Sequence, residues 1–378
     1  MAEITPVPLA ALTTLGTGGT PARMIDANTT DELITALREE WSYGGRCLVL
    51  GGGSNLFVGD GPLDLTVIRV LTHGIERLPD PQSGVARVRV AAGHGWDDLV
   101  AYTVGEGLAG IEALSGIPGT VGAAPVQNIG AYGQEIVQTL VSVQLIDEST
   151  MEVLEVPAAE LKLGFRTSVL KAHDGGVPIR EAVILTVTLD LAIVGDAGIA
   201  IGGAQLRNAL GLADGDTAAL ADIRTRILQV RAGKGMVLDP ADPDTNSAGS
   251  FFQNAVVSET VARTLPEDCP RWPVAPDSGT ATVIPLTAFD GSVPSLDAQV
   301  PDVKVSAAWL IEHAGFAKGF HLPGSRASLS TKHTLALTNR GGARAEEIAE
   351  LARFVRTRVL QEYGLMLRPE PVLVSVEI

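Results

Sequence analysis

The stretch Ser115-Gly-Ile-Pro-Gly-Thr-Val-Gly122, which continues to Asn128-Ile-Gly-Ala-Tyr-Gly133, carries the strongest fold signal in this chain. Its glycines are more densely spaced than a single turn requires, and apolar residues interrupt them. Glycine lets the backbone approach a ligand closely, and successive backbone N–H groups can bind a phosphate without any side chain. We therefore predict that this stretch holds a flat or phosphorylated ligand against its backbone.

A second glycine loop lies upstream, where Gly51-Gly-Gly-Ser-Asn-Leu56 follows the apolar run Arg46–Leu50. The run predicts a short buried strand, and a strand that leads into glycines is a phosphate-binding arrangement. A simple turn is the alternative for Gly51–Gly53. A G-x-G-x-x-G match at Gly105–Gly110 is not a dinucleotide fingerprint, because it follows the predicted helix Trp96–Val104 rather than a strand. We interpret Gly105 as the left-handed cap of that helix.

Composition excludes several classes of protein. The formal charge of −16 over 378 residues argues against a nucleic-acid or anionic-membrane surface. Two distant cysteines and six histidines without metal-ligand spacing predict neither a disulfide framework nor a metal site. The chain lacks an apolar run of the roughly 20 residues that a membrane span needs, and its first residues do not resemble a secretory signal. We expect a cytoplasmic protein.

Hydrophobic periodicity predicts a mixed succession of helices and strands. Asp239–Asn246, rich in proline and aspartate, reads as a linker at a domain boundary, and Asp290–Gln299 as a further loop. Helices are predicted at Thr30–Glu40, Trp96–Val104, Asp222–Gly233, Ser306–His313 and Arg344–Glu362, and strands at Arg46–Leu50, Leu65–Leu71, Val85–Ala92, Val141–Ile146, Ala182–Leu191 and Pro371–Ile378.

The two glycine loops and three later segments resemble the bacterial UDP-N-acetylenolpyruvoylglucosamine reductases. The later segments are Gly164–Ser168, Asn246–Asn254 and Leu367–Pro371, and together the matches span nearly the whole chain. The resemblance implies an α+β fold, in which a two-unit FAD-binding region of the vanillyl-alcohol-oxidase type precedes an α+β substrate-binding domain. It places the first FAD-binding subdomain at 1–71, the second at 72–230, the substrate-binding domain at 231–365, and a C-terminal strand with the catalytic glutamate at 366–378.

The resemblance also implies cofactors and site residues. Members pass hydride from NADPH to non-covalent FAD and then to the enolpyruvyl group of a UDP-sugar, which yields UDP-N-acetylmuramate for peptidoglycan precursor synthesis; we expect a monomer. The catalytic positions fall on Arg166, Ser250 and Glu370, and the substrate's phosphates on Lys234 and Asn254. The FAD-binding positions are Gly51, Gly52, Gly53, Ser54, Asn55, Leu56, Ser115, Gly116, Ile117, Pro118, Gly119, Thr120, Gly122, Asn128, Ile129, Gly130 and Arg231.

The reaction needs these residue types. Hydride that reaches the β-carbon of an enolpyruvyl group leaves an enolate whose charge spreads onto the carboxylate. Arg166 and Glu370, a cation and a hydrogen-bonding acid, suit that charge, and the Ser250 hydroxyl can protonate the α-carbon. Structural roles are the alternatives: a helix cap for Ser250, a surface ion pair for Arg166 and a solvated strand end for Glu370. Lys234 could equally end a helix, and Asn254 could be a turn or cap residue.

This chain departs from the family pattern at three places. Phe165 stands where a tyrosine is usual, Gln253 replaces a frequent lysine, and the region 198–206 lacks the tyrosine that closes over the substrate in many relatives. The reduction chemistry does not depend on these positions. Two other functions stay open: an FAD-linked oxidase of the same fold that acts on a sugar lactone or hydroxy acid, and a nucleotide-sugar binding protein without catalysis.

Overall fold

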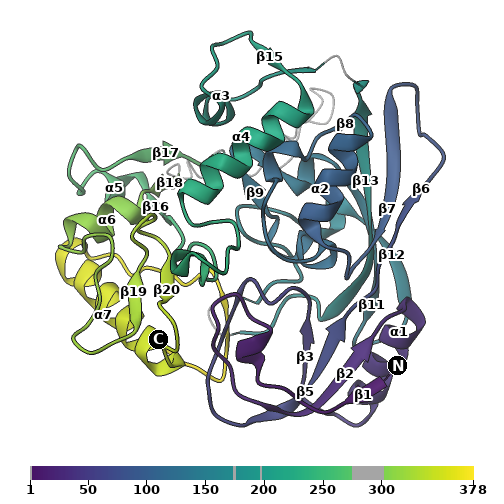
Figure 1. Ribbon diagram of the computed structural model, residues 1–378, viewed down its shortest axis with the longest axis horizontal. Coiled ribbons are helices and arrows are strands. Elements are labelled where there is room, and N and C mark those ends of the chain that lie inside the picture. The colour runs from purple at the N-terminus through teal and green to yellow at the C-terminus, as the bar shows by residue number, and fades with distance from the viewer. Residues whose placement is uncertain (1, 173–175, 196–197, 275–301) are drawn as a thin grey trace, which may run out of the picture.

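A computed structural model describes residues 2–172, 176–195, 198–274 and 302–378 (Figure 1). The loop expected at Asp290–Gln299 lies outside the described residues. Within them, an N-terminal sheet, a larger central sheet and a C-terminal α+β unit together line a cavity. The predicted α+β class is confirmed. None of the described helices is long and apolar enough to cross a bilayer.

The N-terminal sheet has the strand order β1-β2-β5-β3, with β2 and β3 parallel to β5. Its helix α1 (Thr30–Ser42) begins after Thr29, whose hydroxyl accepts the N–H of Glu32, and packs Leu33 and Leu37 into the core. The helix predicted at Thr30–Glu40 and the strands predicted at Arg46–Leu50 and Leu65–Leu71 are confirmed. The strands are β1 (Ala2–Ile4), β2 (Pro21–Ala27), β3 (Cys47–Leu50), β4 (Leu56–Val58) and β5 (Leu63–Val70).

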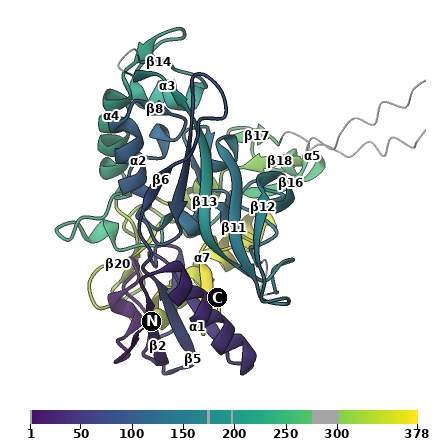
Figure 2. The same cartoon turned by 90° about the vertical axis from the view of Figure 1, so that its right-hand side faces the viewer.

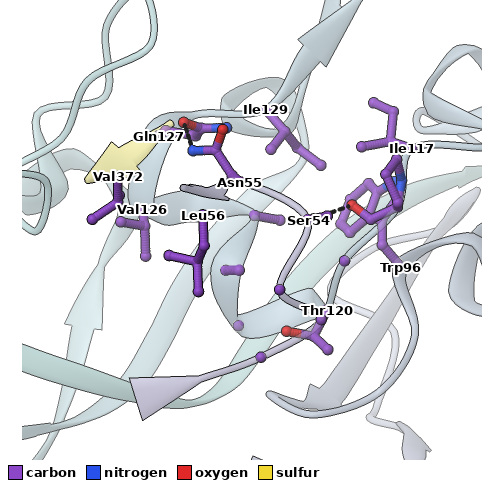
Figure 3. A pocket seen from close by; sticks show the side chains of 18 of the residues that line it. Ser54, Asn55, Leu56, Trp96, Ile117, Thr120, Val126, Gln127, Ile129 and Val372 are labelled. Atoms are coloured by element: carbon purple, nitrogen blue, oxygen red, sulfur yellow. Dashed lines mark hydrogen bonds between the residues drawn. The ribbon is translucent and has the colours of Figure 1, made fainter. Parts of the chain in front are cut away.

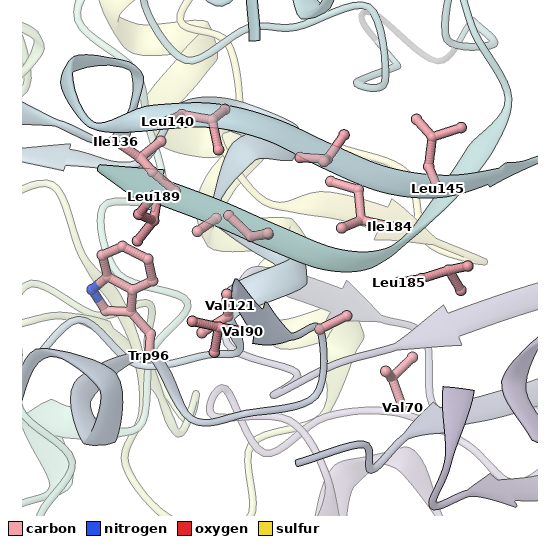
Figure 4. Close-up of a cluster of buried hydrophobic side chains, with 14 of the residues drawn as sticks. Val70, Val90, Trp96, Val121, Ile136, Leu140, Leu145, Ile184, Leu185 and Leu189 are labelled. Carbon is pink, nitrogen blue, oxygen red and sulfur yellow. The ribbon is translucent and has the colours of Figure 1, made fainter. Parts of the chain in front are cut away.

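The central sheet has the order β12-β11-β13-β7-β6, with β8 beside β13. Strand β7 alternates buried and half-buried residues as the sequence predicts for a strand with one covered face. Helix α2 (Trp96–Gly105) packs Trp96 against Leu189 and Val121 in the buried cluster of Figure 4. The strands are β6 (Ile75–Arg77), β7 (Val85–Ala91), β8 (Leu108–Ala109), β11 (Leu140–Asp147), β12 (Val153–Pro157) and β13 (Ala182–Ile193).

Helix α4 (Leu220–Gly233) lies next to α2 on the same side of the central sheet (Figure 2). It packs Ile223 and Ile227 on a short segment at 199–218. That segment contains β14 (Ile199–Ala200), α3 (Ala204–Leu210) and β15 (Thr217–Ala218); a small hairpin, β9 (Gly130–Ala131) with β10 (Gln134–Glu135), lies beside the second glycine loop.

The C-terminal unit has its own core, to which Phe251, Leu310 and Leu351 contribute. Its sheet has the order β16-β18-β17, and helix α7 (Ala345–Tyr363) covers the hairpin of β19 and β20. The remaining elements are β16 (Ala255–Ser258), α5 (Glu259–Ala262), β17 (Arg271–Pro273), β18 (Asp302–Val305), α6 (Ala307–His313), β19 (Ala327–Leu329) and β20 (Leu337–Asn339).

The last strand, β21 (Val372–Val374), leaves this unit and pairs in parallel with β4 of the N-terminal region. It is shorter than the predicted strand Pro371–Ile378, because Ser375 takes a left-handed backbone, φ +52°, that ends the ladder. A second expectation was also wrong: Gly105 is the last residue of α2, and the left-handed glycine is Gly107, at φ +65°.

Candidate active site

A cavity of about 610 Å³ lies between the three units, within the roughly 300–1,000 Å³ that is usual for ligand sites. Both glycine loops line it, together with residues of β13, α4 and the C-terminal unit. Figure 3 shows Ser54, Asn55, Ile117 and Thr120 around the cavity, with Val372 of β21 near Leu56. The structure therefore brings the two predicted glycine motifs to one site.

The glycine loops need glycine because they pack on each other. A Cβ on Gly52 would lie 2.7 Å from the Cα of Gly119, and one on Gly53 would lie 2.0 Å from the carbonyl oxygen of Leu12. The Ser54 hydroxyl donates to the carbonyl of Pro118 at 3.1 Å, a bond drawn in Figure 3. The close approach inferred from the sequence thus occurs between two backbones, and the face that they form together lines the cavity.

The cavity wall fits a pyrophosphate-bearing cofactor. Within the described residues, the backbone N–H groups of Gly52, Gly53 and Ser54 have no protein acceptor, so they can donate to phosphate oxygens. Arg231 reaches the wall from the last turn of α4 and donates to the carbonyls of Gly116 and Met236. Its buried Nε has no hydrogen-bond partner in the described part of the chain, and a buried unsatisfied donor indicates a missing ligand oxygen.

Arg166 and Glu370 face each other at the cavity wall. Their Nε and Oε1 atoms are 3.1 Å apart, and the side chains are 25% and 13% exposed. Arg166 also donates to the carbonyl of Gly130, and it holds a left-handed backbone at φ +54°. A non-glycine residue in that region is strained, and such strain is concentrated at functional sites. The pair is therefore neither a surface ion pair nor a solvated strand end.

Ser250 enters the same cavity on a segment fixed from both sides. Gly249, at φ +72°, turns the chain, and the buried rings of Phe251 and Phe252 anchor it in the C-terminal core. The N–H of Phe251 donates to the carbonyl of Leu335, and its carbonyl accepts the N–H of Glu370 at 2.9 Å. Backbone hydrogen bonding thus ties the serine to the glutamate, and Ser250 caps no helix in the structure.

Two polar residues that line the cavity, Lys171 and Gln127, were not predicted from the sequence. The Lys171 ammonium donates to Gln127 Oε1 at 3.1 Å, and the same oxygen accepts the Asn55 amide at 2.9 Å. Burial lowers the pKa of Lys171, while the nearby Glu370 carboxylate opposes that effect. Both residues lie close to motifs that the sequence does single out. Gln127 directly precedes Asn128, and Lys171 follows Arg166 by five residues, so a search for polar residues next to these motifs could have found them.

Five predicted site residues lie outside the cavity wall. Asn128 is buried and joins Glu135 to the carbonyl of Gly164, whereas Asn254 accepts the N–H of Ala307 at the start of α6. Lys234 ends α4 with its ammonium 5.9 Å from the centre of the Tyr132 ring. The buried Ser115 donates to the carbonyl of Glu112, and the Gly116 N–H donates to Asp97. The other predicted residues line the cavity.

Two models of known protein families match this chain. Residues 21–156 match the family model described as an FAD binding domain, so the chain is an FAD-binding flavoprotein of the oxidoreductase class. Residues 240–374 match the model described as UDP-N-acetylenolpyruvoylglucosamine reductase, C-terminal domain. The chain therefore belongs to the UDP-N-acetylenolpyruvoylglucosamine reductase family, and the predicted resemblance is confirmed.

Individual members of the family are similar to this chain over nearly its full length. The chain is 50% identical to the UDP-N-acetylenolpyruvoylglucosamine reductase of Leifsonia xyli subsp. xyli, with 98% of this chain and 99% of the relative covered. It is 45% identical to that of Thermobifida fusca, with 98% and 97% covered. The crystal structure of the Thermus caldophilus reductase is 26% identical, covers 99% of each chain and superposes with a TM-score of 0.60.

Proposed function

We propose that this protein reduces the enolpyruvyl group of UDP-N-acetylenolpyruvoylglucosamine to give UDP-N-acetylmuramate, with non-covalent FAD as cofactor and NADPH as hydride source. The observation that carries this proposal is the meeting of Arg166, Ser250 and Glu370 at one end of the cavity that the glycine loops line. Family membership over the full length supports the same reaction. We further infer a cytoplasmic monomer that acts in peptidoglycan precursor synthesis.

The proposed site residues form two groups. The flavin cradle consists of the two glycine loops and Arg231, and the reaction end consists of Arg166, Ser250 and Glu370. FAD, when bound, supplies the hydride transfer between NADPH and the substrate. The free backbone donors of the glycine loops bind its phosphates, and the orphaned Nε of Arg231 donates to the bound group. Lys234 and Asn254, near the C-terminal unit, contact the diphosphate of the UDP-sugar; both roles come from the family motif.

At the reaction end, charge and proton are handled by different groups. The Arg166 guanidinium binds the substrate's carboxylate, where the enolate charge develops, and Glu370 holds that guanidinium in place from 3.1 Å. The Ser250 hydroxyl then gives its proton to the α-carbon of the enolate. Phe251 and Phe252 behind the serine keep water away from this end. The result is a reduced lactyl ether with its carboxylate still bound by the cation.

The division into subdomains is part of this proposal. The ranges 1–71 and 72–230 form the FAD-binding region, 231–365 the substrate-binding domain, and 366–378 the segment that returns Glu370 to the cavity. Pairing of β21 with β4 supports a separate role for the last segment, since it joins the C-terminal core, on which Leu367 and Leu373 pack, to the strand that follows the first glycine loop.

The test is an absorbance spectrum followed by anaerobic titration. The purified protein should be yellow, NADPH should bleach the flavin, and the enolpyruvyl UDP-sugar should restore the oxidised spectrum. A colourless protein that releases no flavin on denaturation would refute the proposal. Bleaching by a sugar lactone or a hydroxy acid instead of NADPH would indicate an oxidase of the same fold.

A further inference from the structure

One residue outside the cavity wall contacts the serine of the reaction end. The Nε2 atom of His333 lies 3.3 Å from Ser250 Oγ, although 83 positions separate the two residues. They meet because the Phe251 N–H donates to the carbonyl of Leu335 at 2.7 Å, which ties the serine segment to the turn between β19 and β20. His333 belongs to that turn and is not among the residues that line the cavity.

The turn holds the imidazole firmly. The fully buried Ser330 accepts the N–H groups of both Lys332 and His333 on its hydroxyl, at 3.1 and 3.2 Å. The His333 carbonyl in turn accepts the N–H of Ala336 at 3.0 Å. These bonds fix the backbone of His333 beside the serine segment, and the ring makes its hydrogen bond with Ser250 from that backbone.

The surroundings of the ring favour the neutral imidazole. Burial is the main cause that lowers the pKa of His333, to about 4, and the cations Lys234, Lys318 and Arg231 lower it further. Glu312, on α6, is the acidic group that opposes them, and its carboxylate accepts the hydroxyl of the adjacent Thr334. At neutral pH the ring therefore carries one N–H and one lone pair.

The role of Ser250 depends on which of these faces its oxygen. A lone pair on Nε2 would draw the hydroxyl proton toward the histidine and make the serine a nucleophile, as in hydrolases, where a carboxylate orients the histidine. Among the described residues, no carboxylate hydrogen-bonds to this imidazole. An Nε2–H that donates to Oγ leaves the hydroxyl proton free to point into the cavity and stabilises the oxygen once that proton is gone.

We propose that His333 is a positioning residue that donates its Nε2–H to Ser250 Oγ, directs the serine proton into the cavity and returns a proton to the serine after each turnover. The inference rests on the proposed role of Ser250. In the proton transfer to the enolate, the Ser250 O–H bond breaks as a C–H bond forms at the substrate's α-carbon. The alkoxide then takes the Nε2 proton while Nδ1 takes one from a water molecule, which leaves as hydroxide into solvent. Tautomer exchange restores the ring, so the product's new proton comes from solvent.

The test separates the two half-reactions in the holoenzyme by rapid mixing. His333→Leu should leave flavin reduction by NADPH within about twofold of wild type and slow reoxidation by the enolpyruvyl UDP-sugar by roughly 10²-fold, the size of a general-acid contribution. His333→Gln can place an amide N–H near the former Nε2 position and should recover most of that loss. The solvent deuterium isotope effect on reoxidation should rise in His333→Leu, because proton transfer becomes rate-limiting. The exposed His321 provides the matched control, and His321→Leu should change neither half-reaction.

Ser250→Ala, measured in parallel, distinguishes failure of this inference from failure of the proposed function. If Ser250→Ala blocks reoxidation while His333→Leu reoxidises at the wild-type rate, the role of His333 is refuted and the role of Ser250 stands. If Ser250→Ala reoxidises normally, the proposed proton donor itself is wrong. Equal losses of His333→Leu in both half-reactions, without recovery in His333→Gln, would refute the positioning role in favour of a structural one.

Discussion

Replacing Gly52 with alanine should loosen the flavin cradle by forcing the two glycine loops apart. The new Cβ would lie 2.7 Å from the Cα of Gly119 and 3.1 Å from its carbonyl carbon, backbone atoms that no rotamer change can move. Over-packing of this kind costs about 1–3 kcal/mol. If the loops separate to relieve the contact, FAD binding weakens by a similar free energy. Since 1.4 kcal/mol is a factor of ten, the Kd for FAD should rise about 5- to 140-fold.

Two measurements check this expectation. Urea unfolding of the flavin-free protein gives the loss of stability, and a fluorescence titration with FAD gives the Kd. Gly105→Ala is the matched control, because a Cβ there meets no atom within 4 Å and the residue ends helix α2. That change should raise the free energy of unfolding by up to about 1 kcal/mol and leave FAD binding unchanged. A Gly52→Ala protein with wild-type stability and Kd would refute loop packing as the reason for glycine.

Three further changes probe the reaction end and the buried charges. Glu370→Gln should slow reduction of the enolpyruvyl substrate about 10²-fold by freeing the Arg166 guanidinium. It should lower the free energy of unfolding by about 1–2 kcal/mol, less than the roughly 3–5 kcal/mol of a fully buried pair, since Arg166 is 25% exposed; wild-type turnover would exclude the role. Lys171→Met should leave thermal stability unchanged or slightly raised, because an apolar side chain suits the buried position, yet lower turnover about tenfold. Unaltered turnover would remove Lys171 from the site. For His333, the folded pKa of about 4 lies below the unfolded value near 6.5, so the unfolded chain binds more protons in that range and stability falls as pH drops from 6.5 to 4. The loss in the free energy of unfolding should approach about 3 kcal/mol in the flavin-free protein. Urea unfolding at a series of pH values measures it, and His333→Gln should make the free energy of unfolding less dependent on pH in this range.

The sequence predicted those helices and loops that depend on neighbouring residues, such as a capping side chain or a regular apolar spacing. Thr29 caps α1, and apolar spacing defines α4 and α7, so these helices were found to within a few residues. The glycine loops were predicted because their composition departs so far from that of a turn. Gly105 was assigned the cap that Gly107 provides, since two glycines so close together give no local preference for either.

The remaining features depend on contacts between distant parts of the chain. Lys171 reaches the cavity only through the way the segment after β12 folds beside Gln127. His333 meets Ser250 through a backbone hydrogen bond between two segments that share no motif. Pairing of β21 with β4 joins residues more than 300 positions apart. No periodicity or propensity within a short window records such contacts, so the site had to come from the family pattern and its geometry from the fold.

The pairing of β21 with β4 also sets the order in which the enzyme is completed during synthesis. Domains fold largely as they leave the ribosome, N-terminal regions first. The first glycine loop and β4 are made more than 300 residues before Glu370 and β21. A nascent chain can therefore pack its two glycine loops on each other well before Glu370 is available to pair with Arg166. The Glu370 carboxylate reaches Arg166 only after β21 has been made and has paired with β4, so this ion pair marks the completion of the proposed site.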